Sequence, residues 1–596
     1  MAAATDTSPA PPFLGVDQSV TGKAWRLREA DDAAVADMAR AADIPDLLAR
    51  LLVSRGISAD DAERHLDPKL RDWFPDPSSF ADMDAAAAAI WDAVEAGQAL
   101  AVFADYDVDG GTSAAQLIRY FRTLGRRLDL YVPDRIAEGY GPSKEAFEVL
   151  KSRGADLVIT VDCGAAAGEA LEAARDIGLD VVVVDHHLMG AELPPAKAVV
   201  NPNRADDKSG CGHMAAAGVT FVLLAALNRE GRRRGVFGDT PEPDLFDFID
   251  LAALGTVCDV VPLTTVNRAI VAQGLKRMGG WANTGLKALA DVAGVETTPG
   301  TYHAGFLLGP RINAGGRVGR ADLGARLLST DDPAEAAEIA AELDLLNKER
   351  REIEAEVLDA ACAQIESMNR DVPVLIAHGP DWHPGVIGVV AGRVKERYGR
   401  PAIVIGVSEG VGKGSGRSVP GVDLGTAIGD AKRAGLLPSG GGHAMAGGLT
   451  VAEADIPALT EFLQGALADQ FAAAGDAMAL KIDGVLSPAG ATEALVTKLM
   501  AAGPFGQGNG EPRFVLNDVR VVYAERVGGA HVRFSLAAPT GERIGGIAFR
   551  AADGPLGEAL LGGEGPVWHA AGRLKLDEWR GRRRVDFHLE DLAPAD

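Results

Sequence analysis

The sequence predicts a multidomain α/β protein that ends in a small β-barrel. Three short apolar runs, Leu100–Ala104, Leu157–Val161 and Val181–Val184, alternate with helical segments, which is the pattern of a parallel sheet. Five strand-like segments follow one another in the last part of the chain, separated by glycine-rich turns. The length of 596 residues corresponds to several domains at roughly 150 residues each.

Composition excludes two broad classes of protein. Hydrophobic residues make up 47% of the chain and charged residues 24%, which is ordinary for a globular protein and argues against a disordered or fibrous one. The chain has 59 Lys and Arg against 84 Asp and Glu, a net charge of −25. A uniformly basic protein that coats nucleic acid is therefore excluded, whereas a local basic groove is not.

Cysteine usage and the N-terminal sequence indicate the compartment. The four cysteines lie far apart and form no CxxC pair, so neither a zinc ribbon nor a disulfide scaffold is predicted. The N-terminus lacks a basic start followed by an apolar segment, and no stretch reaches about 18 uninterrupted apolar residues. We therefore expect a soluble protein in the reducing cytoplasm.

The first hundred residues divide into two parts. Residues 1–25 are rich in Ala, Thr, Ser, Pro and Gly without clear apolar periodicity, so we expect a mobile tail. Residues 26–97 place apolar side chains at intervals of three and four, with polar caps and terminal glycines. This second part is predicted to be a helical N-terminal lead-in.

Two α/β domains joined by a helix are expected next. Residues 98–330 contain the three apolar runs and form the predicted parallel-sheet domain. Residues 331–370 read as one long charged helix with a single apolar face, which would bridge two domains. Residues 371–475 form a second αβ domain, in which a helix at 386–399 lies between strands at 372–378 and 401–407.

The last part of the chain has all-β character. Residues 476–511 are assigned to a connector, and residues 512–596 carry the five strand-like segments. Short strands of this number and spacing favour a small closed barrel, for which an OB-fold is the natural candidate.

Acidic side chains gather where the first predicted strand ends. Asp105, Asp107 and Asp109 follow that strand, and Gly110 and Gly111 come directly after them. The carboxyl ends of parallel strands form the ligand crevice of such sheets, and three neighbouring anions require cations. The competing interpretation of this motif alone is a solvated acidic turn that caps a helix.

The second and third strands end in similar groups. Asp162 follows the second strand, and Asp185, His186 and His187 follow the third. Carboxylate oxygens with neutral imidazole suit Mn²⁺ or Mg²⁺, whereas a thiolate-rich set would indicate zinc. We interpret Cys163 as a packing residue. A lone DHH triplet can also be a capping Asp beside a partly exposed His, but three strand ends in agreement favour a site.

A fourth acid interrupts an apolar stretch further along. Asp259 stands in Gly255-Thr-Val-Cys-Asp-Val-Val-Pro-Leu263, where an isolated carboxylate is costly unless it is paired or bound to metal. Taken alone, it could equally cap a helix end.

The order of these motifs resembles the DHH phosphoesterase superfamily, and within it the RecJ family. Four further motifs carry the RecJ likeness: GPRINAGGR from Gly309, WHPGVIG from Trp382, GKGSGRS from Gly412, and Gly441-Gly-His443. The resemblance extends from about Val35 to the C-terminus. It implies a DHH catalytic domain at 98–330, a DHHA1-like substrate-binding domain at 371–475 and an OB-like DNA-binding domain at 512–596.

The resemblance also implies an activity and a metal centre. RecJ-like proteins are single-stranded-DNA-specific exonucleases of DNA repair and recombination, which cut from 5′ to 3′ with Mn²⁺ or Mg²⁺ and release 5′-mononucleotides. By motif position the ligands of two ions would be Asp107, Asp109, Asp162, His186 and Asp259, with Asp162 as the bridge. Asp105 is a further candidate, because Phe103 stands where small relatives carry a His.

His187 would act on the substrate rather than on the metal. By resemblance it contacts the scissile phosphate and stabilises the charge that develops there. In the competing interpretation, His187 does not act on the substrate but orients His186, which binds the metal.

The remaining motifs supply the implied substrate contacts. The donors at glycine-rich bends suit phosphate geometry, and the assigned residues are Arg311, Asn313, Arg317, His383, Ser415, Arg417, Ser418 and His443. The two arginines could instead form salt bridges with the acidic surface. The two histidines could be structural.

The barrel contains a locally basic stretch. Between Trp568 and His588 there are six Lys and Arg against three Asp and Glu, interleaved with Trp568, Trp579 and Phe587. Such a surface could stack bases and follow a strand backbone, unless these aromatics fill the core of the barrel.

Two rival functions are open at this point. One is a DHH phosphodiesterase of short oligonucleotides or cyclic dinucleotides, and the other is a non-catalytic replication scaffold. The barrel and the Gly309–Arg317 motif count against the first, and the intact acidic residues count against the second. By resemblance, the expected partners are single-stranded DNA, single-strand-binding protein and a RecQ-type helicase.

Overall fold

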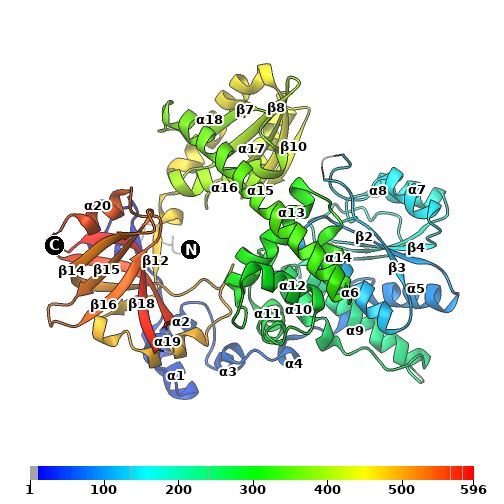
Figure 1. Ribbon diagram of the computed structural model, residues 1–596, viewed down its shortest axis with the longest axis horizontal. Helices are drawn as coiled ribbons and strands as arrows, with labels where there is room; N and C mark the ends of the chain where they lie inside the picture. Colours follow the sequence, from blue (N-terminus) through cyan, green and yellow to red (C-terminus); the bar gives the residue numbers. More distant parts are fainter. Residues whose placement is uncertain (1–10, 136, 239, 564, 580–581, 596) are drawn as a thin grey trace, which may run out of the picture.

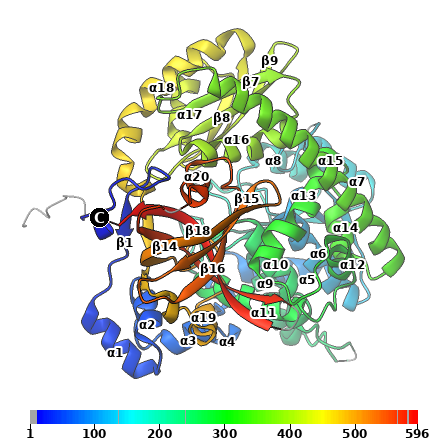
Figure 2. The same cartoon turned by 60° about the vertical axis from the view of Figure 1, so that its left-hand side comes forward.

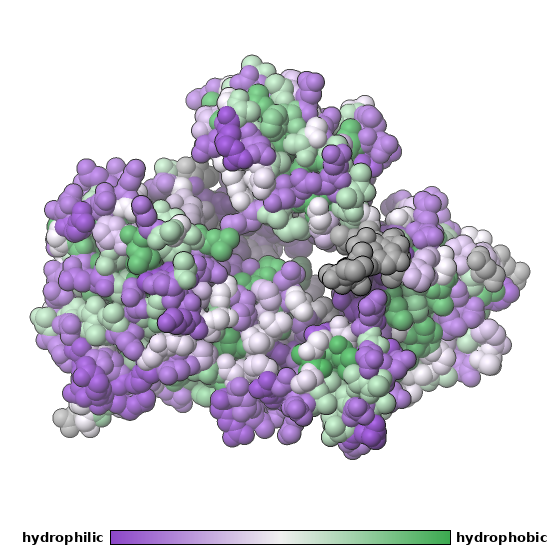
Figure 3. All heavy atoms as spheres, turned by 180° about the vertical axis from the view of Figure 1, so that it is seen from behind, coloured by the Kyte–Doolittle hydropathy of each residue, from purple (hydrophilic) through white to green (hydrophobic). Residues whose placement is uncertain are grey.

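Three folded parts surround a central hollow. The computed structural model describes residues 11–595 except Ile136, Asp239, Glu564 and residues 580–581. A parallel-sheet domain, a second α/β domain and a β-barrel lie around the centre of the molecule (Figure 1). The space-filling view from behind shows the surface hollowed where the three parts meet (Figure 3).

The first domain is built on a five-stranded parallel sheet of order β3-β2-β4-β5-β6. Its strands are β2 (Leu100–Ala104), β3 (Leu128–Tyr131), β4 (Leu157–Val161), β5 (Asp180–Val184) and β6 (Ala198–Val200). The central strands are buried along their whole length because helices cover both faces, which explains their continuous apolar sequences. The predicted parallel sheet is confirmed.

Helices of the same domain form its two outer layers. Those with their apolar faces in the main core include α5 (Met83–Glu95), α6 (Val108–Thr123), α9 (Ala216–Arg234) and α10 (Ile249–Cys258). The opposite face carries α7 (Lys144–Ser152) and α8 (Gly168–Asp176). The domain continues through α11 (Thr265–Met278), α12 (Thr284–Ala293), the π-helix η4 (His303–Leu308), α13 (Gly309–Val318) and α14 (Leu323–Ser329).

One long helix joins the two α/β domains. Helix α15 spans Pro333–Glu366, and the Asp332 side chain caps its start by accepting from the amide of Ala334. Its first half packs on α12, α13 and α14, and it also contacts α16 and β7 of the second domain. The bridging role predicted for residues 331–370 matches this arrangement.

The second α/β domain has a mixed five-stranded sheet of order β10-β11-β9-β8-β7. Its elements are β7 (Leu375–Pro380), α16 (Pro384–Tyr398), β8 (Ala402–Ser408), β9 (Val411–Arg417), α17 (Leu424–Arg433), β10 (Ser439–His443), β11 (Ala446–Ala452) and α18 (Ile456–Ala473). Only β7 and β8 pair in parallel. Strands β9 and β10 are glycine-rich, so apolar alternation alone does not predict them.

The C-terminal part closes into a five-stranded barrel, as expected for an OB-fold. The strands are β14 (Phe514–Val527), β15 (His531–Ala537), β16 (Arg543–Ala548), β17 (Trp568–Trp579) and β18 (Arg582–Pro594), and the pairing of β14 with β17 closes the ring. Helix α20 (Pro555–Leu561) packs on β14 and β15. Before the barrel come β12 (Leu480–Ile482), β13 (Gly484–Leu486) and α19 (Glu493–Met500).

Two aromatic residues expected to stack bases belong to the core of the barrel. Trp568 is 7% exposed and Phe587 is fully buried, so both pack inside the closed sheet. The proposed stacking role of these two side chains is wrong, and the alternative of core packing is correct. The side chains of Trp579, Arg580 and Arg582 lie outside the described residues.

The N-terminal segment packs on the barrel. Helices α1 (Asp32–Ala42), α2 (Asp46–Val53) and α3 (Ala62–Leu66) lie beneath it, and α4 (Leu70–Trp73) continues toward the first domain (Figure 2). Strand β1 (Trp25–Leu27) pairs in parallel with β12, and the buried Trp25 indole donates to Asp591 Oδ2 at 2.9 Å.

This packing extends into the segment expected to be a mobile tail. Residues 11–25 are ordered against the barrel, where the amide of Val20 donates to the carbonyl of Leu592. The partners lie more than 500 residues away in the sequence, so local composition could not predict them. Residues 1–10 lie outside the described residues. Among the helices that the structure describes, none is long and apolar enough to span a membrane.

Candidate metal centre

The sheet register brings three acidic turns to one edge. Ala104 pairs with Val161, and Val161 pairs with Val184, so these three strands end at the same level. The residues that follow them therefore lie side by side at the carboxyl edge of the sheet. They include Asp105, Asp162 and Asp185, all three nearly fully buried.

The first acidic turn leads directly into a helix. Asp107 is the N-cap of α6, and its Oδ1 accepts from the amides of Asp109 at 2.8 Å and Gly110 at 3.2 Å. A Cβ at Gly110 would lie 2.4 Å from the carbonyl oxygen of Asp105, so only glycine fits this turn. The tight turn places the Asp105 and Asp107 carboxylates beside Asp162.

Asp109 is held in place by the start of another helix. Its two oxygens accept from the amides of Ala216 at 2.7 Å and Ala217 at 2.8 Å, both in the first turn of α9. Helix α10 approaches closely because Gly255 has no side chain, and a Cβ there would lie 2.8 Å from Asp109 Oδ1. Asp109 is therefore fixed in position inside the core, with only 1% of its surface exposed.

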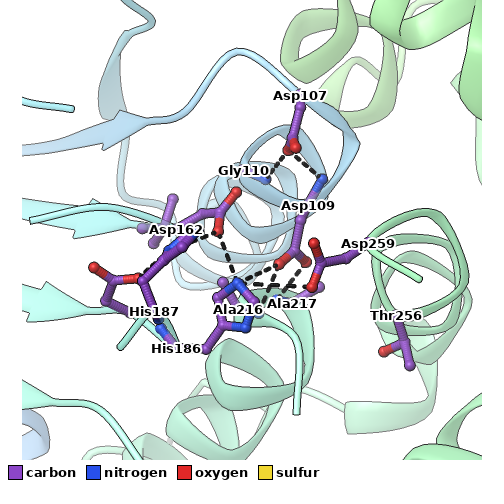
Figure 4. A network of polar contacts seen from close by, with 12 residues as sticks. Asp107, Asp109, Gly110, Asp162, His186, His187, Ala216, Ala217, Thr256 and Asp259 are labelled. Carbon is purple, nitrogen blue, oxygen red and sulfur yellow. Dashed lines mark hydrogen bonds and ion pairs between the residues drawn. The ribbon is translucent and has the colours of Figure 1, made fainter. Parts of the chain in front are cut away.

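His186 lies at the centre of the acidic group (Figure 4). Its Nε2 is 3.3 Å from Asp162 Oδ1, 3.6 Å from Asp259 Oδ2 and 3.8 Å from Asp109 Oδ2. Asp259 reaches the group from the C-terminal end of α10. All four side chains come from different elements, so the site depends on the assembled domain.

Three ligand sets can be recognised, and one of them shares a residue with each of the other two. Asp109, His186 and Asp259 form one set, and Asp105, Asp107 and Asp162 form another, with the ligand atoms of each set within 4.8 Å of one another. Asp162 also lies close enough to His186 and His187 to share a site with them. This position between the sets is the one expected of a bridging carboxylate.

The side chains fit divalent cations. Asp162 Oδ1, His186 Nε2 and Asp105 Oδ1 are buried without a hydrogen-bond partner among the described residues, which is costly unless a cation binds them. Oxygen-rich donors with one imidazole suit Mn²⁺ or Mg²⁺. Phe103 is fully buried and stacks on Tyr131, so that position supplies no ligand, and Asp105 is the additional acid.

Burial and mutual repulsion raise the pKa values of the clustered carboxyls. The pKa of Asp105 rises to about 8, that of Asp109 to about 7 and that of Asp259 to about 9, because each is desolvated and faces other aspartates. The pKa of Asp162 is also raised well above its usual value by the same causes. Burial lowers the pKa of His186 to about 4, which keeps its imidazole neutral and able to bind metal.

His187 is held from behind by Asp185. Asp185 Oδ1 accepts from the amides of His186 and His187 and lies 2.8 Å from His187 Nδ1, while its Oδ2 accepts from the amide of Ala165. Burial opposes a charge on His187, but the Asp185 carboxylate outweighs it and raises the pKa of the imidazole. Both oxygens of Asp185 are therefore engaged in holding the turn and His187. This engagement explains why Asp185 is not one of the predicted metal ligands.

Two residues near the centre were not predicted from the sequence. Tyr140 Oη lies 3.0 Å from the carbonyl oxygen of Asp162 and 3.1 Å from His187 Nδ1. The Arg135 guanidinium lies over the ring of Tyr106, 5.0 Å from its centroid. Both belong to the loop after β3, a strand whose short sequence LDLY carries too little apolar pattern to be recognised.

Arginines from two domains gather beside the acidic group. Arg317 of α13 is close enough to Arg135 and Arg417 for their charges to lower its pKa to about 10, after the larger effect of burial. Among the described residues, no carboxylate lies within ion-pair distance of these three guanidiniums. An unpaired cluster of this kind is suited to bind phosphate.

The second α/β domain contributes a helix N-terminus to the same place. Gly385 and Gly388 lie in the first turns of α16, and the Arg317 guanidinium donates to the Gly385 carbonyl at 2.8 Å. A Cβ at Gly388 would lie 3.0 Å from Ser415 Oγ and 3.2 Å from Arg417 Nη2, so β9 is in close contact with this helix. The helix N-terminus itself is capped by His383, so the side chains of Arg317, Ser415 and Arg417 supply the donors at this place.

Several predicted substrate residues have structural partners instead. Arg311 donates to Asp344 Oδ1 at 3.0 Å and to the Leu307 carbonyl, which is the salt-bridge alternative. Asn313 Oδ1 accepts from the amide of Val108 at 3.2 Å and thereby positions the start of α6. Ser418 is buried and donates to the Val422 carbonyl at 2.7 Å.

The two predicted histidines of the second domain differ from each other. His383 is the N-cap of α16, and its Nδ1 accepts from the amide of Gly385 at 3.1 Å. His443 ends β10 and is exposed. The structure therefore brings Arg317, Ser415 and Arg417 together near the metal centre but leaves His443 on an open strand end.

Basic residues of the barrel are partly neutralised. Arg573 and Lys575 pair with Glu511, and Arg573 also pairs with Glu590. Arg584 pairs with Asp586 at 2.9 Å. The local basic excess seen in the sequence is therefore smaller on the folded surface.

Comparison with known families divides the chain as the fold does. Residues 99–256 match the family model described as "DHH family, N-terminal domain", residues 371–469 match "DHHA1 domain", and residues 482–591 match "RecJ OB domain". The three matches coincide with the parallel-sheet domain, the second α/β domain and the barrel.

Whole-chain comparisons agree with the domain matches. The "Single-stranded-DNA-specific exonuclease RecJ" of Escherichia coli is 36% identical over 96% of this chain and 99% of its own. A crystal structure of RecJ with Mn²⁺ from Thermus thermophilus superposes with a TM-score of 0.79 at 30% identity, covering 95% of this chain and 79% of that one. The Mg²⁺ complex of the same protein gives a TM-score of 0.74 at 29% identity over 96% and 78%.

Proposed function

The chain belongs to the RecJ family of metal-dependent nucleases, and from that premise we propose that it degrades single-stranded DNA from the 5′ end to 5′-mononucleotides. One observation carries the proposal. The buried carboxylate and imidazole cluster lies beside three arginines that have no carboxylate partner in the part of the chain that the structure describes, so a phosphodiester can meet both at once.

The metal ligands are assigned from these ligand sets. We assign Asp109, His186 and Asp259 to one ion and Asp105 and Asp107 to the other, with Asp162 between them. Bound there, Mn²⁺ or Mg²⁺ would lower the pKa of a water molecule and polarise the scissile phosphodiester. A water oxygen bonds to phosphorus as the P–O3′ bond breaks, and the departing 3′ oxygen takes up a proton.

The chain's own side chains orient the reacting groups. His187 presents Nε2 to the phosphate because its Nδ1 is engaged by Asp185. A donor at that position stabilises charge on the phosphate oxygens as the bond breaks. Tyr140 supports the backbone of Asp162 from the side of the substrate.

The arginine cluster favours cleavage at a strand end. We assign Arg135, Arg317 and Arg417 to the phosphate next to the scissile one, together with the hydroxyl of Ser415. For a strand that enters by its 5′ end, the phosphate next to the scissile one is the terminal 5′ phosphate. The geometry gives no support to DNA contacts by Arg311 and Ser418, whose partners are within the protein.

Charge limits the attraction of DNA from a distance. The net charge of −25 opposes long-range steering, so we expect affinity to come from the surroundings of the metal centre, where Arg135, Arg317 and Arg417 lie close together. We therefore propose that the barrel guides the strand toward the metal centre and that binding weakens strongly with added salt.

The cellular setting follows from the substrate. We place the activity in the cytoplasm, in DNA repair and recombination. Single-strand-binding protein and a RecQ-type helicase are proposed partners on the same basis. Co-purification of each with the full chain, in the presence of nuclease to remove bridging DNA, tests these two associations.

A labelled-strand assay tests the activity. A long single strand, labelled at either end, is digested with Mn²⁺ next to a blunt duplex. We expect 5′ label to appear at once as mononucleotide, 3′-labelled material to shorten gradually, and the duplex to persist. Cleavage of very short oligonucleotides alone would favour a small-substrate phosphodiesterase, and no cleavage with several divalent ions would favour a scaffold.

A further inference from the structure

A second polar cavity lies at the other end of two helices that carry metal-centre residues. Helix α6 begins directly after its N-cap Asp107, α10 ends beside Asp259, and the two helices pack on each other. Their opposite ends border a cavity of about 400 Å³, here called the α6–α10 cavity. Its lining includes Arg119, Arg122, Phe248, Asp250, Arg277 and Asp331. Figure 1 shows α6, α10, α11 and α12 grouped in this part of the domain.

The α6–α10 cavity has a carboxylate buried in its wall. Asp250 is 2% exposed, and its Oδ1 accepts from the amide of Leu251 at 2.8 Å in its own helix. No cation lies within ion-pair distance of Asp250 among the residues that the structure describes. Burial raises the pKa of Asp250 to about 6, although the charges of Arg119 and Arg277 lower it. Within the residues that the structure describes, the Leu251 amide therefore donates to Oδ1 alone of this carboxylate.

Guanidiniums on the same wall also have unused donors. Arg119 Nε is buried with no hydrogen-bond partner among the described residues. Arg119 and Arg122 reach Asp331 at 2.8 and 2.6 Å, and both contacts use Nη1 alone. Arg277 reaches Asp247 at 2.6 Å through Nη2. The buried Nε of Arg119 is out of a ligand's reach, but each arginine keeps N–H groups on its other Nη that can face a ligand without breaking its ion pair.

We propose that the α6–α10 cavity binds a guanine nucleotide, with the base on Asp250 and the phosphate on the arginines. This binding site is separate from the proposed nuclease centre and does not depend on that activity. The wall carries Arg119, Arg122 and Arg277 against Asp247, Asp250 and Asp331, so it suits a ligand that offers both hydrogen-bond donors and anionic oxygens. A cavity of this volume is in the range that holds a small organic ligand.

The chemistry of Asp250 selects the base. A carboxylate accepts two parallel hydrogen bonds, and guanine offers N1–H beside its N2 amino group. Adenine and cytosine place one amino donor next to an acceptor, which would face the carboxylate unfavourably. A phosphate offers more oxygen acceptors to several guanidiniums than the single carboxylate of an amino acid does. An amino acid is therefore disfavoured as the ligand.

Calorimetric titration of the full chain tests the proposal. The buffer contains EDTA, so that the metal centre cannot hold nucleotide through cations, and the probes are GMP, dGMP, AMP and inorganic phosphate. We expect saturable binding of guanine nucleotides, with AMP and phosphate at least about tenfold weaker. Tighter binding of dGMP would identify the nuclease's own product as the source, and tighter binding of GMP the ribonucleotide pool.

Matched variants separate base recognition from phosphate recognition. Asp250→Asn keeps the shape of the side chain and should weaken GMP at least about tenfold, bringing it to the level of AMP. Arg122→Ala, at a half-exposed position, should weaken GMP and AMP alike. Arg153→Ala removes an ion-paired arginine of similar exposure outside the cavity and should change neither.

Three outcomes would overturn the proposal. They are absence of saturable guanine-nucleotide binding, AMP binding as tightly as GMP, and unchanged GMP affinity in the Arg122→Ala variant. Thermal unfolding reports whether Asp250→Asn is folded. Should it not fold, the Arg122→Ala and Arg277→Ala variants decide the question, because both side chains are more than 40% exposed.

Discussion

His187 Nδ1 lies 2.8 Å from Asp185 Oδ1, and this contact decides which nitrogen of the ring is free for the substrate. An ionised carboxylate can only accept, so Nδ1 carries a proton and donates to Asp185. The Tyr140 hydroxyl, 3.0 Å from the Asp162 carbonyl, then donates to that carbonyl. Nε2 is left free on a half-exposed side chain, where we propose that it faces the phosphate.

The His187→Ala variant should lose rate more than affinity. Loss of a positioned donor reduces kcat by about a hundredfold or more, with a much smaller change in KM for a long single strand. Tyr140→Phe retains the ring but removes the hydroxyl, and a smaller loss in kcat is expected. Steady-state kinetics with Mn²⁺ measures both. A rise in KM with kcat unchanged would assign His187 to binding alone.

The Asp162→Ala variant should abolish metal-dependent cleavage. Asp162 lies between the two ligand sets, so its loss disturbs both, and we expect a fall in rate of more than about a thousandfold. The fold should persist because removal of Asp162 also relieves repulsion among buried acids. Single-turnover cleavage and circular dichroism are the measurements. Asp176→Ala, at an exposed acid of the same domain, is the matched control, and residual cleavage at the wild-type rate would contradict the assignment.

The stability of the metal-free protein should fall as pH rises, whereas the stabilisation by bound metal should increase. The pKa values of Asp105, Asp109 and Asp259 are raised to about 8, 7 and 9 in the folded state, against 3.8 in the unfolded chain. Protonation of these groups stabilises the metal-free fold below about pH 4, and this contribution is lost as pH rises toward 9.

Thermal unfolding between pH 5 and 9 tests this expectation. Tm of the metal-free protein should fall as pH rises, and saturating Mn²⁺ should raise Tm most at the alkaline end, where the carboxylates are ionised. The Asp162→Ala variant should show a weaker response to Mn²⁺. If Mn²⁺ raised Tm equally at all pH values, the ionisation of these acids would not be linked to the binding of cations.

The sequence predicts the acidic centre well because strand ends are local signals. Each of β2, β4 and β5 is a short apolar run directly followed by an acid, and parallel pairing then brings the acids together. Asp259 is recognisable for a related reason, since a lone acid in an apolar stretch is costly. These inferences need only the strands and their order.

Residues whose role depends on distant partners could not be predicted in the same way. Arg311 and Arg317 stand in one glycine-rich motif, yet one pairs with Asp344 and the other faces a second domain. Trp25 is in a segment with the composition of a tail, but its partner Asp591 belongs to the last strand. Composition and spacing carry no information about such contacts.

Arg417→Ala should impair the capture of a phosphorylated strand end. Arg417 lies near Arg135 and Arg317 with no carboxylate partner among the described residues, so its loss removes charge from the proposed phosphate site. We expect KM for 5′-phosphorylated single strands to rise about tenfold, with a smaller effect on 5′-hydroxyl strands. Arg320→Ala, at an exposed arginine paired with Asp322, is the control. Equal effects on both substrates would remove Arg417 from the terminal phosphate.

Trp25→Ala should loosen the N-terminal segment from the barrel. The Trp25 side chain is fully buried against Val515, Ala571 and Ala593, and its Nε1 donates to Asp591. Truncation leaves a cavity and removes the indole donor to the buried Asp591 Oδ2, which together should cost about 3–5 kcal/mol in the free energy of unfolding. Urea unfolding followed by tryptophan fluorescence and circular dichroism measures the loss. Leu27→Ala, at an exposed position of the same strand, should cost far less, and a similar loss in both variants would mean that the strand pairing, not the indole, holds the segment in place.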